Sequence, residues 1–193
     1  PTASEVVEWA KSNIGKRINI DNYRGSQCWD TPNFIFKRYW GFVTWGNAKD
    51  MANYRYPKGF RFYRYSSGFV PEPGDIAVWH PGNGIGSDGH TAIVVGPSNK
   101  SYFYSVDQNW VNSNSWTGSP GRLVRHPYVS VTGFVRPPYS KDTSKPSSTD
   151  TSSASKANDS TITGEAKKPQ FKEVKTVKYT CLLYTSPSPR DRT

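Results

Sequence analysis

The stretch from Gln27 to Trp40, QCWDTPNFIFKRYW, decides how the N-terminal part of this 193-residue chain folds. Its apolar and aromatic residues have helical character, and Pro32 limits where a helix can start. Proline lacks a backbone N–H and is tolerated in the first turn of a helix. The helix is therefore predicted to begin near Gln27 to Trp29, which puts Cys28 at its N-terminus.

Cys28 has a setting that can make a thiol reactive, because the free N–H groups and the dipole at a helix N-terminus stabilise a thiolate. The alternative is a buried cysteine that packs as a small apolar residue. A polar loop, residues 17–27, precedes Cys28 and argues against burial. The other cysteine, Cys181, lies near the C-terminus, and two cysteines do not make a disulfide framework.

The remaining pattern predicts an α+β domain, with helices first and an antiparallel sheet afterwards. Thr2 and Glu5 fit a capping box at the start of an amphipathic helix that Gly15 stops. Residues 45–50 predict a short capped helical turn. Six short strands are expected at 60–66, 75–79, 91–95, 102–107, 121–125 and 131–136, with residues 96–99 as the turn of a hairpin.

Three histidines could act as a base toward Cys28. His90 follows a glycine-rich loop and opens the apolar run TAIVV, so its imidazole is expected at the mouth of a strand. His80 is expected in a loop, and His126 stands before a proline with no polar partner apparent from the sequence. For any single one of them a structural role is the more common outcome.

The segment SYFYSVDQNW supplies polar partners for His90. Alternation along a strand places Asp107 and Asn109 on one face and Gln108 on the other. In a hairpin next to the His90 strand, Asp107 or Asn109 could hold the imidazole tautomer, as the third member of a catalytic triad does. The alternative is a polar strand end that closes into a turn.

Five segments, in this order, resemble the CHAP domain (cysteine, histidine-dependent amidohydrolase/peptidase) of staphylococcal phage endolysins. They are QCWD (27–30), WGNAKD (45–50), PGDIAVW (73–79), GHTAIV (89–94) and DQNW (107–110). The resemblance covers about residues 3–138. It implies a papain-like α+β fold with N-terminal helices packed on a roughly six-stranded antiparallel sheet.

The resemblance also implies roles. Cys28 would be the nucleophile, His90 the base, Asn109 the residue that orients His90, and Asp107 a fourth member of the site. Many relatives have glutamate where this chain has Asp107, and the shorter side chain moves the carboxylate.

The loop before Cys28 resembles half of an EF-hand-type oxygen cage, whose ligands suit a hard cation. Calcium-binding relatives place ligands at positions that match the side chains of Asn19, Asp21 and Asp30 and the backbone oxygens of Tyr23 and Gly25. Asn19 and Asn22 replace an aspartate and a glycine of those relatives, which weakens the expected site. A solvated loop rich in Asn and Asp is the alternative. A structural Ca²⁺ near Cys28 is therefore one expectation.

The resemblance further implies a peptidoglycan hydrolase that acts on a Gram-positive, staphylococcal-type wall and cuts the D-Ala–Gly bond. An N-acetylmuramoyl-L-alanine amidase is the alternative within the same family. We expect a monomer without membrane insertion, made in the host cytoplasm and acting on the wall. Trp29, Trp79 and Trp110 could line a cleft for the stem peptide, although core positions are the commoner role of such residues.

Two other classes of function compete. The chain carries a net charge of +10, which favours a polyanionic partner such as nucleic acid, an anionic membrane or teichoic acid. A cell-wall-binding module or a single-stranded nucleic-acid binder would suit the aromatic content. Neither explains why Cys28, His90 and Asn109 occur together in compatible settings.

The composition changes near residue 138. Residues 1–138 are expected to form the catalytic domain, and the Ser/Thr/Lys-rich residues 139–168 a disordered linker. Residues 169–180 resemble the start of a truncated second domain. Residues 181–193, CLLYTSPSPRDRT, are expected to be a non-native tail.

Overall fold

A computed structural model describes residues 1–141 of the chain. Helix α1 (Ala3–Ser12) starts with the expected capping box: Thr2 Oγ1 accepts a hydrogen bond from the Glu5 backbone N–H (3.1 Å), and Glu5 Oε2 accepts one from the Thr2 N–H (2.9 Å). The helix ends at Ser12, shortly before Gly15. Its buried face consists of Val6, Val7 and Ala10.

Helix α2 (Asp30–Trp40) is the helix predicted from the opening stretch. Its N-cap is Trp29, so the first helical residue lies just beyond the expected range. Pro32 is in the first turn, where its missing N–H costs least. Gly41 ends the helix in a left-handed conformation, with φ 75°. The rings of Trp9 in α1 and Phe34 in α2 stack with centroids 4.7 Å apart, which fixes the two helices against each other.

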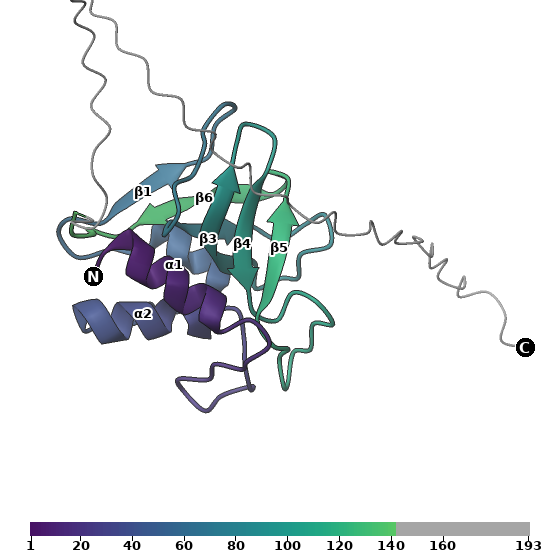
Figure 1. Cartoon of the computed structure of the whole chain (residues 1–193). Coiled ribbons are helices and arrows are strands. Elements are labelled where there is room, and N and C mark those ends of the chain that lie inside the picture. The colour runs from purple at the N-terminus through teal and green to yellow at the C-terminus, as the bar shows by residue number, and fades with distance from the viewer. Residues whose placement is uncertain (142–193) are drawn as a thin grey trace, which may run out of the picture. The chain divides into compact units, whose positions relative to one another are not determined.

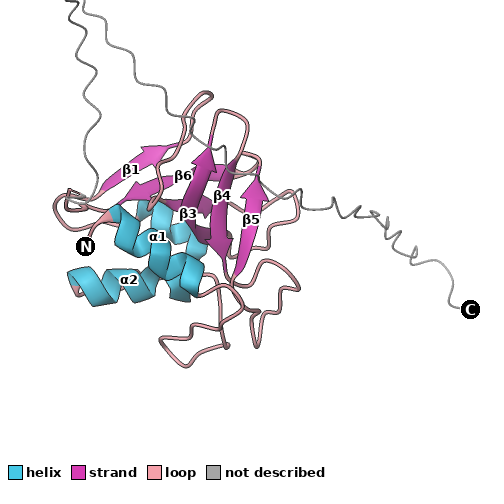
Figure 2. Ribbon diagram, viewed as in Figure 1, coloured by secondary structure: helices cyan, strands magenta, loops and turns pink. Residues whose placement is uncertain are grey.

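The six predicted strands form one antiparallel sheet with the order β1-β6-β2-β3-β4-β5. The strands are β1 (Arg61–Arg64), β2 (Ile76–Trp79), β3 (His90–Ser98), β4 (Phe103–Asp107), β5 (Arg122–His126) and β6 (Val131–Arg136), and a 3-10 helix η1 (Ala48–Asn53) precedes them. Both α-helices lie on one side of the sheet and contact β3 (Figures 1 and 2). The expected α+β class is confirmed.

The hairpin between β3 and β4 turns later than expected. Strand β3 continues through Ser98, and its register against β4 shifts between Val94 and Ser98. The turn follows at Asn99, whose backbone N–H bonds to the Tyr102 carbonyl (2.8 Å) and whose side chain accepts from Ser101 N–H (2.8 Å). An irregular part of a strand accommodates a proline, and an asparagine side chain can close a turn. The prediction of the turn at 96–99 was therefore wrong by three residues.

The sheet is covered by apolar residues on both faces. One cluster lies between the sheet and the two helices and includes Val6, Phe36 and Ile93. A second cluster contains Trp79 and Phe103. Because Trp79 is 1% exposed, it belongs to this second core and does not line a substrate cleft.

The folded domain continues past the expected boundary at residue 138. Tyr139 Oη donates to the Gly74 carbonyl (2.7 Å), and the Ser140 N–H bonds to the Pro1 carbonyl (2.9 Å). The linker, second-domain and tail predictions otherwise concern residues 142–193, which lie outside the described residues. Within residues 1–141, no helix has the length and hydropathy to cross a membrane.

We predict that Tyr139→Ala lowers the free energy of unfolding by roughly 2–4 kcal/mol, because it removes the ring that packs on Trp40 and the hydrogen bond to Gly74. Tyr139→Phe removes the hydrogen bond alone and should cost about 1 kcal/mol. Urea unfolding of the full chain measures both. Wild-type stability of the alanine variant would place the end of the domain at residue 138.

Candidate active site

Cys28 lies two residues before the first residue of α2 and lines a cleft of about 460 Å³. Its side chain is partly exposed, so the reading of Cys28 as a fully buried packing residue is not supported. The positive end of the helix dipole lies beside the thiol, as predicted. A thiol in this place can be both reached by a ligand and stabilised as a thiolate.

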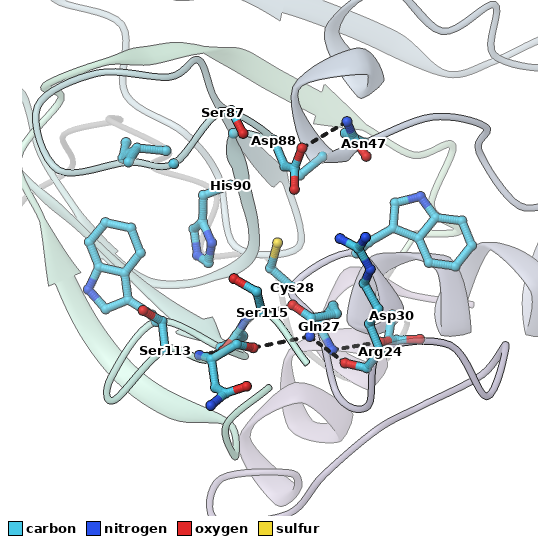
Figure 3. A pocket seen from close by; sticks show the side chains of 18 of the residues that line it. Arg24, Gln27, Cys28, Asp30, Asn47, Ser87, Asp88, His90, Ser113 and Ser115 are labelled. Atoms are coloured by element: carbon cyan, nitrogen blue, oxygen red, sulfur yellow. Dashed lines mark hydrogen bonds between the residues drawn. The ribbon is translucent and has the colours of Figure 1, made fainter. Parts of the chain in front are cut away.

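His90 is the first residue of β3 and faces Cys28 across the cleft, as Figure 3 shows. Its backbone pairs with Trp79 of β2. Gly89 makes the approach to this position possible, since its φ is 74° and a Cβ there would lie 2.5 Å from the Trp79 carbonyl oxygen. The glycine-rich loop thus positions the His90 imidazole at the cleft, although only 4% of the His90 surface is exposed.

Asp107, the last residue of β4, binds the His90 ring through the nitrogen Nε2. Its Oδ2 lies 2.7 Å from His90 Nε2, and it has no exposed surface. Its Oδ1 accepts a hydrogen bond from Ser105 Oγ at 2.5 Å. Because Nε2 of His90 is bound to Asp107, the nitrogen left for the Cys28 thiol is Nδ1.

The surroundings of His90 and Asp107 shift both pKa values toward the charged forms of the two side chains. Burial lowers the pKa of His90, but the charge of Cys28 and the hydrogen bond to Asp107 outweigh burial and raise the pKa to about 9. Burial raises the pKa of Asp107, but hydrogen bonds from His126 and His90 outweigh it and lower the pKa to about 2. The arrangement therefore favours the protonated imidazole of His90 at neutral pH.

Asn109 does not contact His90 in the way that the sequence predicted. Strand β4 ends at Asp107, and Asn109 has a φ of 57°, so the alternation of faces stops before it. The Asn109 amide donates to Gln27 Oε1 (2.6 Å), and its oxygen accepts from the Asn114 N–H (2.8 Å). His90 donates its hydrogen bond to Asp107, and Asn109 instead binds the side chain of Gln27, the residue before Cys28.

Gln108 was not singled out by its sequence, yet it fixes the loop that leads to Cys28. Its side chain is 1% exposed and lies between the two ends of that loop. The amide nitrogen donates to the carbonyls of Ile18 and Gln27, both at 2.7 Å, and the amide oxygen accepts from the Ile18 N–H at 2.7 Å. The strand alternation placed Gln108 on the opposite face from Asp107, but did not show which backbone it would meet.

His126 is the second residue that sequence reasoning missed. It was expected to have no polar partner, whereas its Nε2 lies 2.9 Å from Oδ2 of Asp107. It is buried, with 3% of its surface exposed. The sequence pattern Arg-His-Pro gives no signal of this contact, which depends on strand β5 lying beside β4.

The loop proposed for calcium is closed by its own polar side chains. Asn19 Oδ1 accepts from the Asn22 N–H (2.8 Å), and Asp21 Oδ1 accepts from the Tyr23 N–H (2.8 Å). The backbone oxygens of Tyr23 and Gly25, which were expected to contribute, belong to the same loop. Gly25 has a φ of 65° and packs against the backbone of Thr117.

Asp30 connects this loop to the helix start. Its two carboxylate oxygens accept from the N–H groups of Ile20 (2.9 Å) and Gln27 (2.8 Å), and its surface is 1% exposed. Burial raises the pKa of Asp30 to about 6 against the effect of these hydrogen bonds, and the charge of Asp21 adds to the rise. Among residues 1–141, no three His, Cys, Asp or Glu side chains gather into a metal-binding group.

The walls of the cleft come from loops that are distant in the sequence (Figure 3). Trp29 and Trp110 line it together with Arg24, which decides between the two roles that the sequence left open for these tryptophans. The Arg24 guanidinium lies over the exposed rings of Tyr23 and Trp116, 5.2 and 5.3 Å from their centroids. The cleft therefore has aromatic and cationic groups on the side of the Cys28 loop.

The structure defines an α+β domain of papain-like architecture with a cysteine at a helix start and a histidine at a strand start. Residues 18–109 match the model of the CHAP domain, so this part of the chain is similar to that family. A solved structure of the wild-type endolysin LysIME-EF1 is similar, with a TM-score of 0.65 and 30% identity over 72% of this chain and 65% of that one. The structure of Ly7917 shares the fold, with a TM-score of 0.55 and 15% identity over 72% and 63%.

Three proteins of similar sequence come from staphylococci or their phages. Endolysin PlyTW of Staphylococcus phage Twort is 29% identical over 74% of this chain and 32% of its own length. Endolysin LysK of Staphylococcus phage K is 33% identical over 72% and 28%. Probable autolysin PH of Staphylococcus aureus is 31% identical over 65% and 28%. The chain thus spans about a third or less of each of these relatives.

We predict that NMR titration of the His90 ring gives a pKa near 9, and that Cys28→Ala lowers it because the negative charge beside the ring is removed. The ionised ring is favoured in the folded state. His90 therefore stabilises the fold fully below about pH 6.5, and this contribution is lost as the pH rises through about 9. The signal of the exposed His80 is the internal control. An unchanged His90 titration in the variant would contradict a thiolate–imidazolium pair.

Proposed function

We propose that this chain hydrolyses bacterial peptidoglycan and that Cys28 is the nucleophile. The observation that carries the proposal is that Cys28 and His90 line one cleft, while the buried carboxylate of Asp107 binds the His90 imidazole. A nucleophile, a base and a group that orients the base form the basis of covalent hydrolysis in many unrelated folds. The similar proteins named endolysin and autolysin support cell-wall peptidoglycan as the substrate.

The proposed reaction uses the two nitrogens of His90 differently. Nε2 stays bonded to Asp107, while Nδ1 takes the proton of the Cys28 thiol. The thiolate attacks the carbonyl carbon of a peptide or amide bond, and backbone N–H groups at the start of α2 stabilise the oxyanion. The protonated Nδ1 then gives its proton to the leaving amine. Water attacks the thioester, with Nδ1 accepting its proton, and releases the carboxylic acid and the thiol.

Cys28→Ala should reduce the clearing of staphylococcal cell walls by roughly a thousandfold or more, because no other group in the cleft can form the thioester. His90→Ala should have nearly the same effect. His80→Ala is the matched control and should clear walls as the wild type does, since His80 lies outside the cleft. Clearing at the wild-type rate by a folded Cys28→Ala protein would rule out the mechanism through Cys28.

We further propose that the bond cut is the one between D-Ala and the first glycine of the cross-bridge. A residue without a Cβ in the leaving position allows the substrate backbone to approach Cys28 closely. Mass spectrometry of digested staphylococcal sacculi should then show new glycine N-termini and D-Ala carboxylates. New L-Ala N-termini opposite free lactyl groups would show an amidase, and binding without any cleavage would show a wall-binding module.

We also propose that the loop before Cys28 binds a calcium ion. Asn19, Asp21 and Asp30 each carry side-chain oxygens, the ligands that Ca²⁺ prefers, and each oxygen of Asp30 has a lone pair beyond the one used by Ile20 or Gln27. The mutual repulsion between Asp21 and Asp30 would be relieved by a cation. With the backbone oxygens of Tyr23 and Gly25 these groups would hold the ion. Its role would be to stiffen the loop.

Millimolar Ca²⁺ should therefore raise the melting temperature of the EDTA-treated chain, because a ligand that binds the folded state stabilises it. Asp21→Ala should lose most of this response. Glu8→Ala, which removes a carboxylate from the exposed face of α1, should respond as the wild type does. Equal melting temperatures of the wild type in EDTA and in Ca²⁺ would show that this loop binds no calcium.

A further inference from the structure

The proposed mechanism leaves one buried titratable side chain beside the site without a role. His126 is the last residue of β5 and pairs with Phe103 of β4. Along that face of β4, Phe103 is followed by Ser105 and Asp107, and the imidazole of His126 reaches Asp107. The rings of Trp79 and Trp110, each 4.8 Å from the His126 ring centroid, enclose it.

Two imidazoles therefore share one carboxylate oxygen. His90 Nε2 lies 2.7 Å and His126 Nε2 lies 2.9 Å from Oδ2 of Asp107. The second oxygen of Asp107 is bound by Ser105. A carboxylate accepts and cannot donate, so each imidazole must carry its proton on Nε2 to make its bond.

His126 contributes to the state of Asp107 independently of the chemistry at Cys28. Of the contributions that lower the pKa of Asp107, the hydrogen bond from His126 is the largest and that from His90 comes next. His90 has to exchange a proton in each catalytic cycle, whereas His126 lies behind the carboxylate and outside the residues that line the cleft. A buried carboxylate that loses a donor becomes costly to keep ionised and in place.

We propose that His126 is a positioning residue for the cysteine–histidine pair. It fixes Asp107 so that Oδ2 binds Nε2 of His90 and Nδ1 of His90 faces Cys28. This inference rests on the proposed function for its catalytic meaning, whereas the hydrogen-bond arrangement itself can be tested without substrate.

The test uses the rate at which iodoacetamide alkylates Cys28 in the full chain, measured from pH 5 to pH 10. His126→Leu should slow alkylation at pH 7 roughly a hundredfold, because a misplaced imidazole cannot accept the proton of the Cys28 thiol. His126→Gln keeps an N–H donor and should restore most of the rate. His80→Gln is the matched control and should leave the profile unchanged.

A wild-type profile in a folded His126→Leu protein would overturn the proposal, because a merely structural histidine would leave the thiol unaffected. If the leucine variant does not fold, the proposal is tested by the positions of the imidazole protons in the wild type. Long-range ¹H–¹⁵N spectra should show His126 and His90 both protonated on Nε2. A His126 proton on Nδ1 would overturn the proposal.

The two proposals can fail separately. Rapid alkylation of Cys28 at pH 7 that depends on His126, together with no cleavage of cell walls, would reject the proposed function and keep the positioning role. Wall cleavage that depends on Cys28 but is unchanged in the His126→Leu variant would keep the proposed function and reject the positioning role of His126.

Discussion

The Asp107 carboxylate is a negative charge with no exposed surface, and the cysteine–histidine site depends on how that charge is satisfied. Three donors, from Ser105, His90 and His126, bind its two oxygens. Burying an ionised group without partners costs far more than a typical hydrogen bond contributes. The end of β4 is thus held where the carboxylate meets all three donors, and the orientation of His90 follows from that position.

The nucleophile is placed by a second set of interactions that begins at the same strand end. Gln108 binds both ends of the loop between Ile18 and Gln27, and Asn109 binds the side chain of Gln27. Asp30 closes the loop from the helix side. Consecutive residues 107–109 therefore set the histidine, the loop and the approach to Cys28. A change in the path of this short segment would displace both partners of the proposed reaction.

The sequence was sufficient for features that local patterns determine. Pro32 placed the start of α2 to within three residues, and short Val, Ile, Tyr and Phe runs between turn residues located all six strands. Cys28 and His90 were identified because a helix start and a glycine-rich strand mouth are local settings. The order of strands was not predictable from these patterns, because it depends on packing between segments far apart in the sequence.

The errors have two physical causes. Alternation was extended to Asn109, although the strand ends at Asp107 and the backbone then turns with a positive φ. His126 and Gln108 were missed because their partners lie 19 and 81–90 residues away, respectively. Side-chain hydrogen bonds across such separations leave no periodic signal.

The central claim is that Cys28 is the nucleophile of a peptidoglycan hydrolase. The most direct measurement is to alkylate the full chain to increasing extents and to follow wall clearing against the fraction of Cys28 modified, read by mass spectrometry of the tryptic peptide 25–37. The account predicts that the clearing rate falls in proportion and reaches zero when Cys28 is fully modified. Undiminished clearing with Cys28 fully alkylated would contradict it.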